Sequence, residues 1–285
     1  MIEQIKIKLA HLSELVMFQH SIFSLPFIFI AMLVAAKGWF GWKLFFLGIL
    51  AAVSARNFAM GVNRYLDRDI DALNPRTQNR PSVDGRVSVL SMQVFIGVNA
   101  ILFVVVAYFI NDLAFKLSFP ILLILGAYTL FKRFSSMAHL ILGVTLGLAP
   151  IAGVVAVLGE ITPWSLYLAA GVLFWVAGFD LLYSLQDMEF DKAHGLHSIP
   201  AKFGAEKTLL IAKFFHLMTI VWWAVFVSSA GLGFWAILAV VLSAVMLGYE
   251  HYLVNKDFTK IDRAFFTVNG YLGILFLVLI VLEVA

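Results

Sequence analysis

One acidic pattern occurs twice in this chain, as Asn-Arg-Tyr-Leu-Asp-Arg-Asp-Ile-Asp at 63–71 and as Tyr-Ser-Leu-Gln-Asp-Met-Glu-Phe-Asp at 183–191. The positions that match between the two stretches are four residues apart: Asn63, Asp67 and Asp71 in the first, and Tyr183, Asp187 and Asp191 in the second. In a helix, this spacing places side chains along one face, about 6 Å apart along the axis. The pattern therefore predicts two matching acidic faces, one in each half of the chain.

The carboxylates of these two faces need a counter-charge, because each stretch directly follows a long apolar run. A divalent metal ion is the natural candidate, and an ion bound mainly by carboxylates commonly completes its coordination with a phosphorylated substrate. A simpler alternative is that these acids are solvated helix ends beside Arg64 and Arg68. The repetition of the same spacing, in a chain with 17 acidic residues, favours a site.

The composition predicts a membrane protein. Hydrophobic residues make up 62% of the 285 residues, charged residues 13%, and the mean hydropathy is +0.96. Apolar runs of about 20 residues can cross a bilayer. We expect an all-α, polytopic protein with one domain over 1–285 and nine transmembrane helices: 15–36, 42–63, 90–110, 117–131, 138–158, 165–185, 209–229, 234–252 and 264–284.

The lysines and arginines predict the orientation of these helices. Most of the 20 cationic residues lie at the N-terminus or in the loops after the second, fourth, sixth and eighth predicted spans. Because cytoplasmic loops carry such an excess, we expect a cytoplasmic N-terminus and both acidic stretches at the cytoplasmic side. The lack of a basic soluble domain makes nucleic acid a poor partner.

Two of these loops are long and carry turn-forming residues together with cations. They run over 64–89 and 186–208, and they contain Asp-Ala-Leu-Asn-Pro-Arg-Thr-Gln-Asn-Arg-Pro at 71–81 and Gly-Leu-His-Ser-Ile-Pro at 195–200. Long loops in compact folds are usually functional or disordered, and this composition favours order. We expect both loops to cap the mouth of a cavity in the membrane.

Other polar residues bear on the chemistry. The absence of cysteine excludes disulfides, thiolate metal sites and cysteine nucleophiles. The histidines lack a zinc-binding spacing, so His20, His139 and His216 are interpreted as packing or interface residues. Arg56 and Asp180 lie inside apolar runs, where an unpaired charge is costly. Arg56 either forms a structural ion pair, with Asp180 as one candidate partner, or binds an anion deep in the cavity.

These residues together resemble the UbiA superfamily of intramembrane prenyltransferases, over nearly the whole chain. Its first motif matches Asn63, Asp67, Asp71 and the downstream Asn-Arg-Pro at 79–81, and its second matches Tyr183, Asp187 and Asp191. The segment Tyr-Thr-Leu-Phe-Lys-Arg at 128–133 also resembles the family's fourth helix. Members have nine transmembrane helices around a central cavity. One departure is Arg64, which stands where many 4-hydroxybenzoate enzymes carry aspartate.

The resemblance implies a set of site residues. Two Mg²⁺ ions, one for each acidic cluster, are expected to bind an allylic polyprenyl diphosphate. Catalysis is then assigned to Asp67, Asp71, Asp187 and Asp191, and metal binding to these four and Asn63. Diphosphate binding is assigned to Arg68, Lys132, Arg133, Tyr183 and Lys192, and acceptor binding to Arg56 and Asp180. The prenyl tail is expected to leave between helices toward lipid.

The expected function is transfer of a polyprenyl group to an aromatic acceptor in respiratory quinone synthesis, at the bacterial inner membrane. The stretches 249–251 and 264–270 resemble a 4-hydroxybenzoate polyprenyltransferase-like subgroup thought to act on an aminodeoxyfutalosine-type intermediate of menaquinone synthesis. The acceptor stays open between 4-hydroxybenzoate, such a nucleoside and dihydroxynaphthoate. The alternatives are a secondary transporter for an anionic solute, whose ion and solute would bind Asp67, Asp187 and Arg56, and a haem-farnesylating member of the superfamily.

Overall fold

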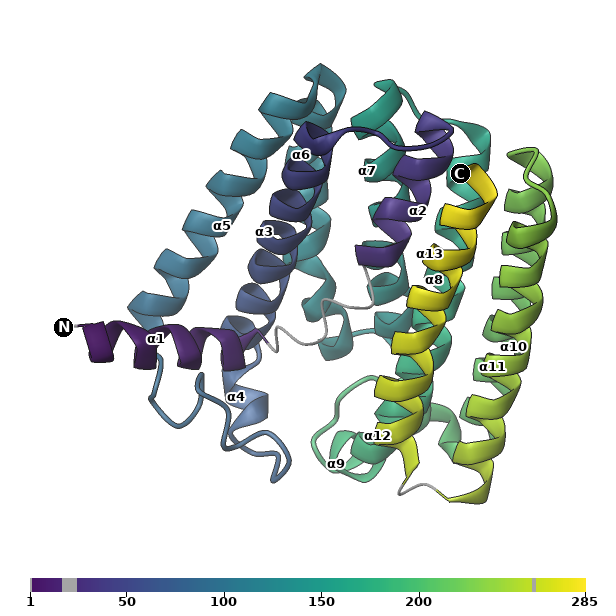
Figure 1. Ribbon diagram of the computed structural model, residues 1–285. Helices are drawn as coiled ribbons and strands as arrows, with labels where there is room; N and C mark the ends of the chain where they lie inside the picture. The colour runs from purple at the N-terminus through teal and green to yellow at the C-terminus, as the bar shows by residue number, and fades with distance from the viewer. Residues whose placement is uncertain (1, 17–24, 258–259) are drawn as a thin grey trace.

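Long apolar runs give this chain its helices, which stand side by side in a computed structural model that describes residues 2–16, 25–257 and 260–285 (Figure 1). The longer helices are α1 (Ile2–Leu15), α2 (Leu25–Ala36), α3 (Trp42–Leu66), α5 (Val89–Ile110), α6 (Asp112–Ala127), α7 (Ala138–Leu158), α8 (Pro163–Ser184), α10 (Ile199–Ser229), α11 (Phe234–Lys256) and α13 (Asn269–Val284). The short elements are α4 (Arg68–Asp71), η2 (Tyr128–Arg133), η3 (Leu185–Asp187), α9 (Met188–Ala193), α12 (Ile261–Arg263) and η5 (Ala264–Val268). No described residue lies in a strand.

The prediction of an all-α membrane protein is confirmed. Within the described ranges, eight helical segments are long and apolar enough to cross a membrane, and α2 is a shorter apolar helix of 12 residues. The first predicted span, 15–36, includes residues 17–24, which lie outside the described residues, as does His20. Large apolar side chains such as Leu90, Leu123 and Val245 are exposed on the outer surface, as a lipid environment requires.

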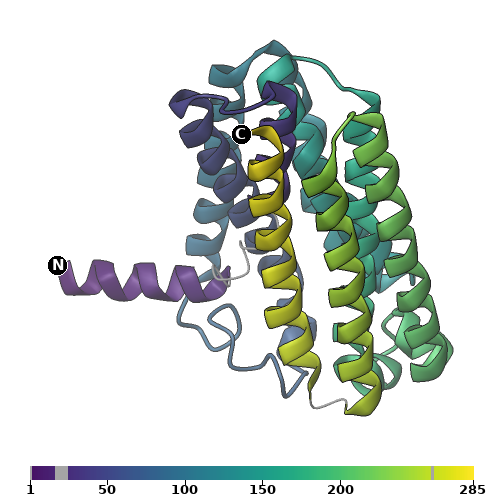
Figure 2. The same ribbon diagram turned by 45° about the vertical axis from the view of Figure 1, so that its right-hand side comes forward.

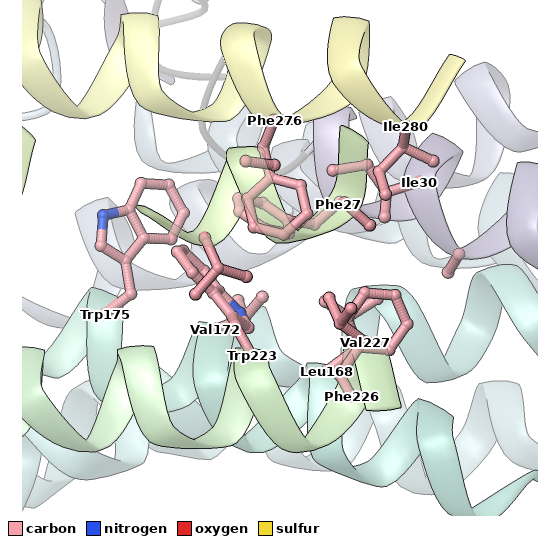
Figure 3. Packing of buried hydrophobic residues seen from close by; sticks show 14 of the residues in the cluster. Phe27, Ile30, Leu168, Val172, Trp175, Trp223, Phe226, Val227, Phe276 and Ile280 are labelled. Atoms are coloured by element: carbon pink, nitrogen blue, oxygen red, sulfur yellow. The ribbon is translucent and has the colours of Figure 1, made fainter. Parts of the chain in front are cut away.

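The bundle has a solid side and a hollow side. The solid side is formed by α2, α8, α10, α11 and α13, and the buried aromatic residues of α2, α8, α10 and α13 pack against one another (Figure 3). There Phe27 stacks on Trp223 with ring centroids 5.3 Å apart, and it also contacts Trp175 and Phe276. The hollow side is formed by α3, α5, α6 and α7, which enclose a cavity described below. Figure 2 shows both groups of helices in one continuous bundle.

The short helices α4, α9 and α12 lie at one end of the bundle, and the C-terminus lies at the opposite end (Figure 1). We call the first of these the α4–α9 end. The predicted loop 186–208 is wrong in its extent, because it contains η3, α9 and the first turns of α10. Ser198 caps α10 by accepting a hydrogen bond from the backbone N–H of Ala201 (3.2 Å), and the positive φ of Gly204 bends its first part.

Close contact between α7 and α8 depends on glycine. A Cβ atom at Gly143 would lie 2.4 Å from the backbone oxygen of Leu173, and one at Gly147 would lie 2.9 Å from the backbone oxygen of Ala169. Real Cβ atoms do not approach backbone oxygens so closely, so both positions need hydrogen. These contacts hold the two helices at the separation that places α8 beside the site.

Replacing Gly143 by alanine should therefore force α7 and α8 apart. The expected loss is about 1–3 kcal/mol, the range for overpacking a tight interface. Thermal unfolding in detergent measures it, with Gly248→Ala on α11 as the matched control, since nothing lies within 4 Å of the added Cβ there. Equal melting temperatures for the two variants would contradict this account of the α7–α8 contact.

Candidate active site

A polar cavity of about 240 Å³ lies at the α4–α9 end of the bundle. Residues from α3, α4, η2, α8, η3 and α9 line it, together with the loop that follows α4. All four predicted carboxylates line this one cavity: Asp67, Asp71, Asp187 and Asp191. The two acidic stretches, 120 residues apart in sequence, therefore share a single space.

Each acidic stretch bends at its central aspartate. The α3 helix ends at Leu66, and Asp67 has φ −92° and ψ 8°. Asp187 follows α8 at the end of the η3 turn, and it has φ −99° and ψ 1°. The prediction that each stretch follows one continuous helical face is therefore wrong. Both aspartates adopt the same sparsely populated backbone region, which many active-site residues occupy, and the chain turns at both of them.

Asp67 is buried and surrounded by donors on one oxygen. Its Oδ2 accepts hydrogen bonds from Asn63 Nδ2 (3.0 Å) and Thr129 Oγ1 (2.9 Å), and it lies 2.7 Å from Lys132 Nζ. Its Oδ1 is buried, accepts no hydrogen bond from a described residue, and lies 3.7 Å from Arg133 Nη2. A buried carboxylate oxygen without a donor is costly, so this atom is suited to binding a further cation.

Asp71 and Asp187 are held by arginines from the loop after α4. Arg80 Nη1 lies 2.7 Å from both oxygens of Asp71. Arg76 donates from Nε to Asp187 Oδ1 (3.0 Å), donates from Nη2 to Asp187 Oδ2, and donates from Nη1 to Tyr183 Oη (3.1 Å). Asn74 Nδ2 adds a bond to Asp187 Oδ1 (3.1 Å). A loop of the first half thereby binds the acidic stretch of the second.

The loop before α10 contacts η2, the element that carries Lys132. The backbone N–H of His197 donates to the carbonyl oxygen of Lys132 at 2.8 Å, which ties this loop to η2. Both predicted caps therefore contribute to the cavity, one through Arg76 and Arg80 and the other by bracing Lys132. In the part of the chain that the structure describes, no three acidic or histidine side chains converge as a preformed metal site.

Three predicted diphosphate-binding residues do not line the cavity. Arg68 Nε donates to the carbonyl oxygen of Ser82 (3.1 Å), and Lys192 pairs with Glu189 on the surface (3.1 Å). Arg133 donates to both oxygens of Asp69 (2.9 and 2.7 Å), which lowers the pKa of that exposed carboxyl. Arg133 also forms a 3.7 Å ion pair with Asp67, but of the five predicted diphosphate-binding residues only Lys132 and Tyr183 line the cavity.

Other cavity residues had not been assigned a role from the sequence. They are Arg64, Asn74, Arg76, Thr77, Arg80 and Ser184. Arg76 and Arg80 lie in the stretch 71–81, where the available signals were the mixture of turn residues and cations and, for Arg80, the Asn-Arg-Pro at 79–81. Nothing in that stretch indicates which carboxylate each arginine would reach.

A second cavity of about 320 Å³ lies among α2, α3, α5, α6 and α7. Its lining is apolar except for a few side chains, which include Arg56 and Tyr128. Leucines line it, Phe103 is the one phenylalanine among the described lining residues, and alanines occupy many positions, among them Ala55, Ala59 and Ala152. Small side chains leave the volume open where phenylalanine would have filled it.

Arg56 and Asp180 are not an ion pair. Asp180 Oδ2 lies 2.7 Å from His139 Nδ1, and Asp180 lines the polar cavity. Arg56 lines the apolar cavity, makes no ion pair with a described residue, and has a buried Nε without a hydrogen-bond partner among them. Of the two interpretations of Arg56, a guanidinium available to an anion agrees with this arrangement.

Comparison with known proteins agrees with this geometry. The model of the UbiA prenyltransferase family matches residues 24–280. The chain belongs to this family. Its similarity extends to the 4-hydroxybenzoate octaprenyltransferase of Saccharophagus degradans, 28% identical over 244 residues that cover 85% of the chain and 80% of that protein. It also extends to the enzyme of the same name from Paracidovorax citrulli, 30% identical over 248 residues that cover 85% and 82%.

Solved structures resemble the whole bundle. The apo structure of a UbiA homolog from Aeropyrum pernix K1 superimposes with a TM-score of 0.85 at 32% identity, over 93% of this chain and 98% of that one. A UbiA homolog from Archaeoglobus fulgidus, bound to GPP and Mg²⁺, has a TM-score of 0.79 at 21% identity, over 96% and 99%. The second likeness concerns the fold alone.

Proposed function

We propose that this protein transfers a polyprenyl group from an allylic polyprenyl diphosphate to an aromatic acceptor in respiratory quinone synthesis. The observation that carries the proposal is one polar cavity shared by two acidic clusters, with an apolar cavity in the same bundle. The first space suits a diphosphate and the second suits a prenyl chain. Membership of the UbiA prenyltransferase family supports the same reaction class.

The carboxylates suit Mg²⁺, which binds oxygen ligands and keeps positions open for substrate phosphates. Asp67 Oδ1, buried without a donor, supports this fit. Asn63, Asp67, Asp71, Asp187 and Asp191 would hold the ions. Bound Mg²⁺ would neutralise the charge that develops on the departing diphosphate.

The cations of the cavity would then change partners. Lys132, Arg76 and Arg80 now neutralise Asp67, Asp187 and Asp71. Once positive ions bind these carboxylates, the same side chains are free to donate charge-assisted hydrogen bonds to diphosphate oxygens. The hydroxyl of Tyr183, now bonded to Arg76, is a further donor at this wall.

Arg56 and Asp180 would bind the acceptor. Arg56 lies seven residues before Asn63 on α3, about two turns deeper in the bundle. A planar guanidinium there would hold a carboxylate by two parallel bonds. The reaction breaks the bond between C1 of the prenyl chain and diphosphate oxygen, forms a bond from a ring carbon to C1, and releases the ring proton to a base. Enclosure in the bundle keeps water from the allylic cation.

The acceptor proposed is a 4-hydroxybenzoate-type aromatic acid, which the names of the relatives support. Arg64, which stands where many 4-hydroxybenzoate enzymes carry aspartate, lines the cavity 4.0 Å from Asp71, so an aminodeoxyfutalosine-type carboxylate is the second candidate. The family match argues against the transporter alternative, and the relatives' names argue against haem farnesylation. We propose the bacterial inner membrane as the location, with the α4–α9 end and the N-terminus toward the cytoplasm.

Single replacements in the two clusters test the shared site. Asp67→Ala and Asp187→Ala should each lower kcat by at least about 100-fold, because each removes a ligand charge from the place where the diphosphate charge develops. Asp69→Ala is the matched control, since Asp69 lies on α4 outside the cavity. Prenylation of 4-hydroxybenzoate with geranyl diphosphate measures the effect, and EDTA should abolish it in the wild type. Turnover that persists in EDTA would refute metal dependence.

Lys132 and Arg133, which are adjacent on η2, should differ in their effect on the affinity for geranyl diphosphate. Lys132→Ala should weaken the binding of geranyl diphosphate by about 1.5–3 kcal/mol, the range for a hydrogen bond to a charged group. Arg133→Ala should change that affinity less than about threefold, because Arg133 does not line the cavity: it donates to Asp69 and lies 3.7 Å from Asp67 Oδ1. Its expected effect is a lower melting temperature. Calorimetric titration in detergent with Mg²⁺ present measures both. Equal losses of affinity would show that Arg133 reaches the substrate.

A further inference from the structure

His139 lies directly behind Asp180 as seen from the polar cavity. It occupies the first turn of α7, its residue exposure is 6%, and it lines neither cavity. Its Nδ1 lies 2.7 Å from Oδ2 of Asp180, which lines the polar cavity. The direct contact of His139 with the cavity lining is therefore the one to Asp180.

The other ring nitrogen of His139 indicates where the proton lies. Nε2 is buried and has no hydrogen-bond partner among the described residues. A buried N–H without an acceptor is rarer in proteins than a buried acceptor without a donor. The favoured tautomer therefore carries its proton on Nδ1 and donates it to Asp180. A carboxylate that accepts this bond is the ionised form, which can take up a proton.

We infer that His139 is a positioning residue for the acceptor half of the reaction, an inference that rests on the proposed function. Its Nδ1–H holds Asp180 Oδ2, which leaves Oδ1 free for the acceptor. After the ring carbon bonds to C1, the C–H electron pair returns to the ring and the proton passes to Asp180 Oδ1. Asp180 becomes a neutral carboxylic acid and later releases the proton to water.

A purely structural role for His139 would be to hold α7 against α8. That contact is already made deeper in the membrane by Gly143 and Gly147, which lie against backbone oxygens of α8. In the rest of α7, from Leu140 to Leu158, no side chain is ionisable. The bundle therefore does not need a polar bond at this point for cohesion, whereas Asp180 needs a donor to keep one orientation.

Two amides of different length test the inference. His139→Asn places an amide N–H near the position of Nδ1, whereas His139→Gln places it near the unpartnered Nε2. We expect His139→Asn to keep kcat for prenylation of 4-hydroxybenzoate within about threefold. His139→Gln should lower it about 10- to 100-fold, the range for loss of a charge-assisted bond. The KM and Kd for geranyl diphosphate and the melting temperature should stay unchanged in both.

A double variant sharpens the result. Asp180→Asn should lower kcat at least as far as His139→Gln, and the double variant His139→Gln/Asp180→Asn should be no slower than Asp180→Asn alone, because the two side chains act as one unit. Three results would each overturn the inference. They are multiplied losses of kcat in the double variant, full activity of His139→Gln, and equal losses of kcat in both amide variants with a matching fall in melting temperature. In those cases wild-type prenyl transfer remains intact. Wild-type protein that binds geranyl diphosphate but prenylates no aromatic acid overturns the proposed function itself.

Discussion

The guanidinium of Arg76 joins the two halves of the polar cavity. It comes from the loop after α4 and binds both oxygens of Asp187, a residue 111 positions later, as well as the hydroxyl of Tyr183. A membrane bundle cannot leave a cluster of carboxylates uncompensated, since an unpaired charge in apolar surroundings is costly. Arg76, Arg80 and Lys132 supply the compensation, and in doing so they fix the loop and η2 over the cavity. The ion pairs that neutralise the site therefore also hold the elements around it.

The same pairing makes the site responsive to a charged substrate. Each cation contacts a carboxylate that would bind a metal ion, so a metal-bound diphosphate exchanges one set of ion pairs for another without leaving any charge unpaired.

The solid side of the bundle contains a separate network of buried polar side chains. There Trp175 donates to Asn269 (2.7 Å) and Asn269 donates to Glu250 (2.8 Å), while His216 and His251 lie in contact at 3.0 Å. These groups are buried away from the cavity and bond one another between α8, α10, α11 and α13, while Glu250 Oε2, His216 Nε2 and His251 Nδ1 have no hydrogen-bond partner among the described residues.

The sequence carried the fold class and the pairing of the acidic stretches, because apolar length and repeated spacing are local properties. The bends at Asp67 and Asp187 could not be predicted from the sequence, because a spacing of four is compatible with a continuous helix and tertiary contacts determine where the helix breaks. Arg76 and Arg80 escaped assignment for a related reason: composition reveals a cationic loop but not which carboxylate each cation reaches. His139 was interpreted as a packing residue because the histidines lack a zinc-binding spacing, and the sequence does not reveal its contact with Asp180, 41 positions away. The ion pair considered between Arg56 and Asp180 is absent because these two distant residues line different cavities, which the sequence does not show.

The account depends on both clusters binding one diphosphate together. Electron paramagnetic resonance of Mn²⁺ bound to the detergent-purified protein tests this directly, with geranyl thiodiphosphate as an unreactive substrate analogue. The account predicts two Mn²⁺ ions per chain with mutual spin coupling when the analogue is present, and one uncoupled ion or none after Asp67→Ala or Asp187→Ala. Two uncoupled ions in the wild type, or a spectrum that neither substitution changes, would contradict a single site shared by the two clusters.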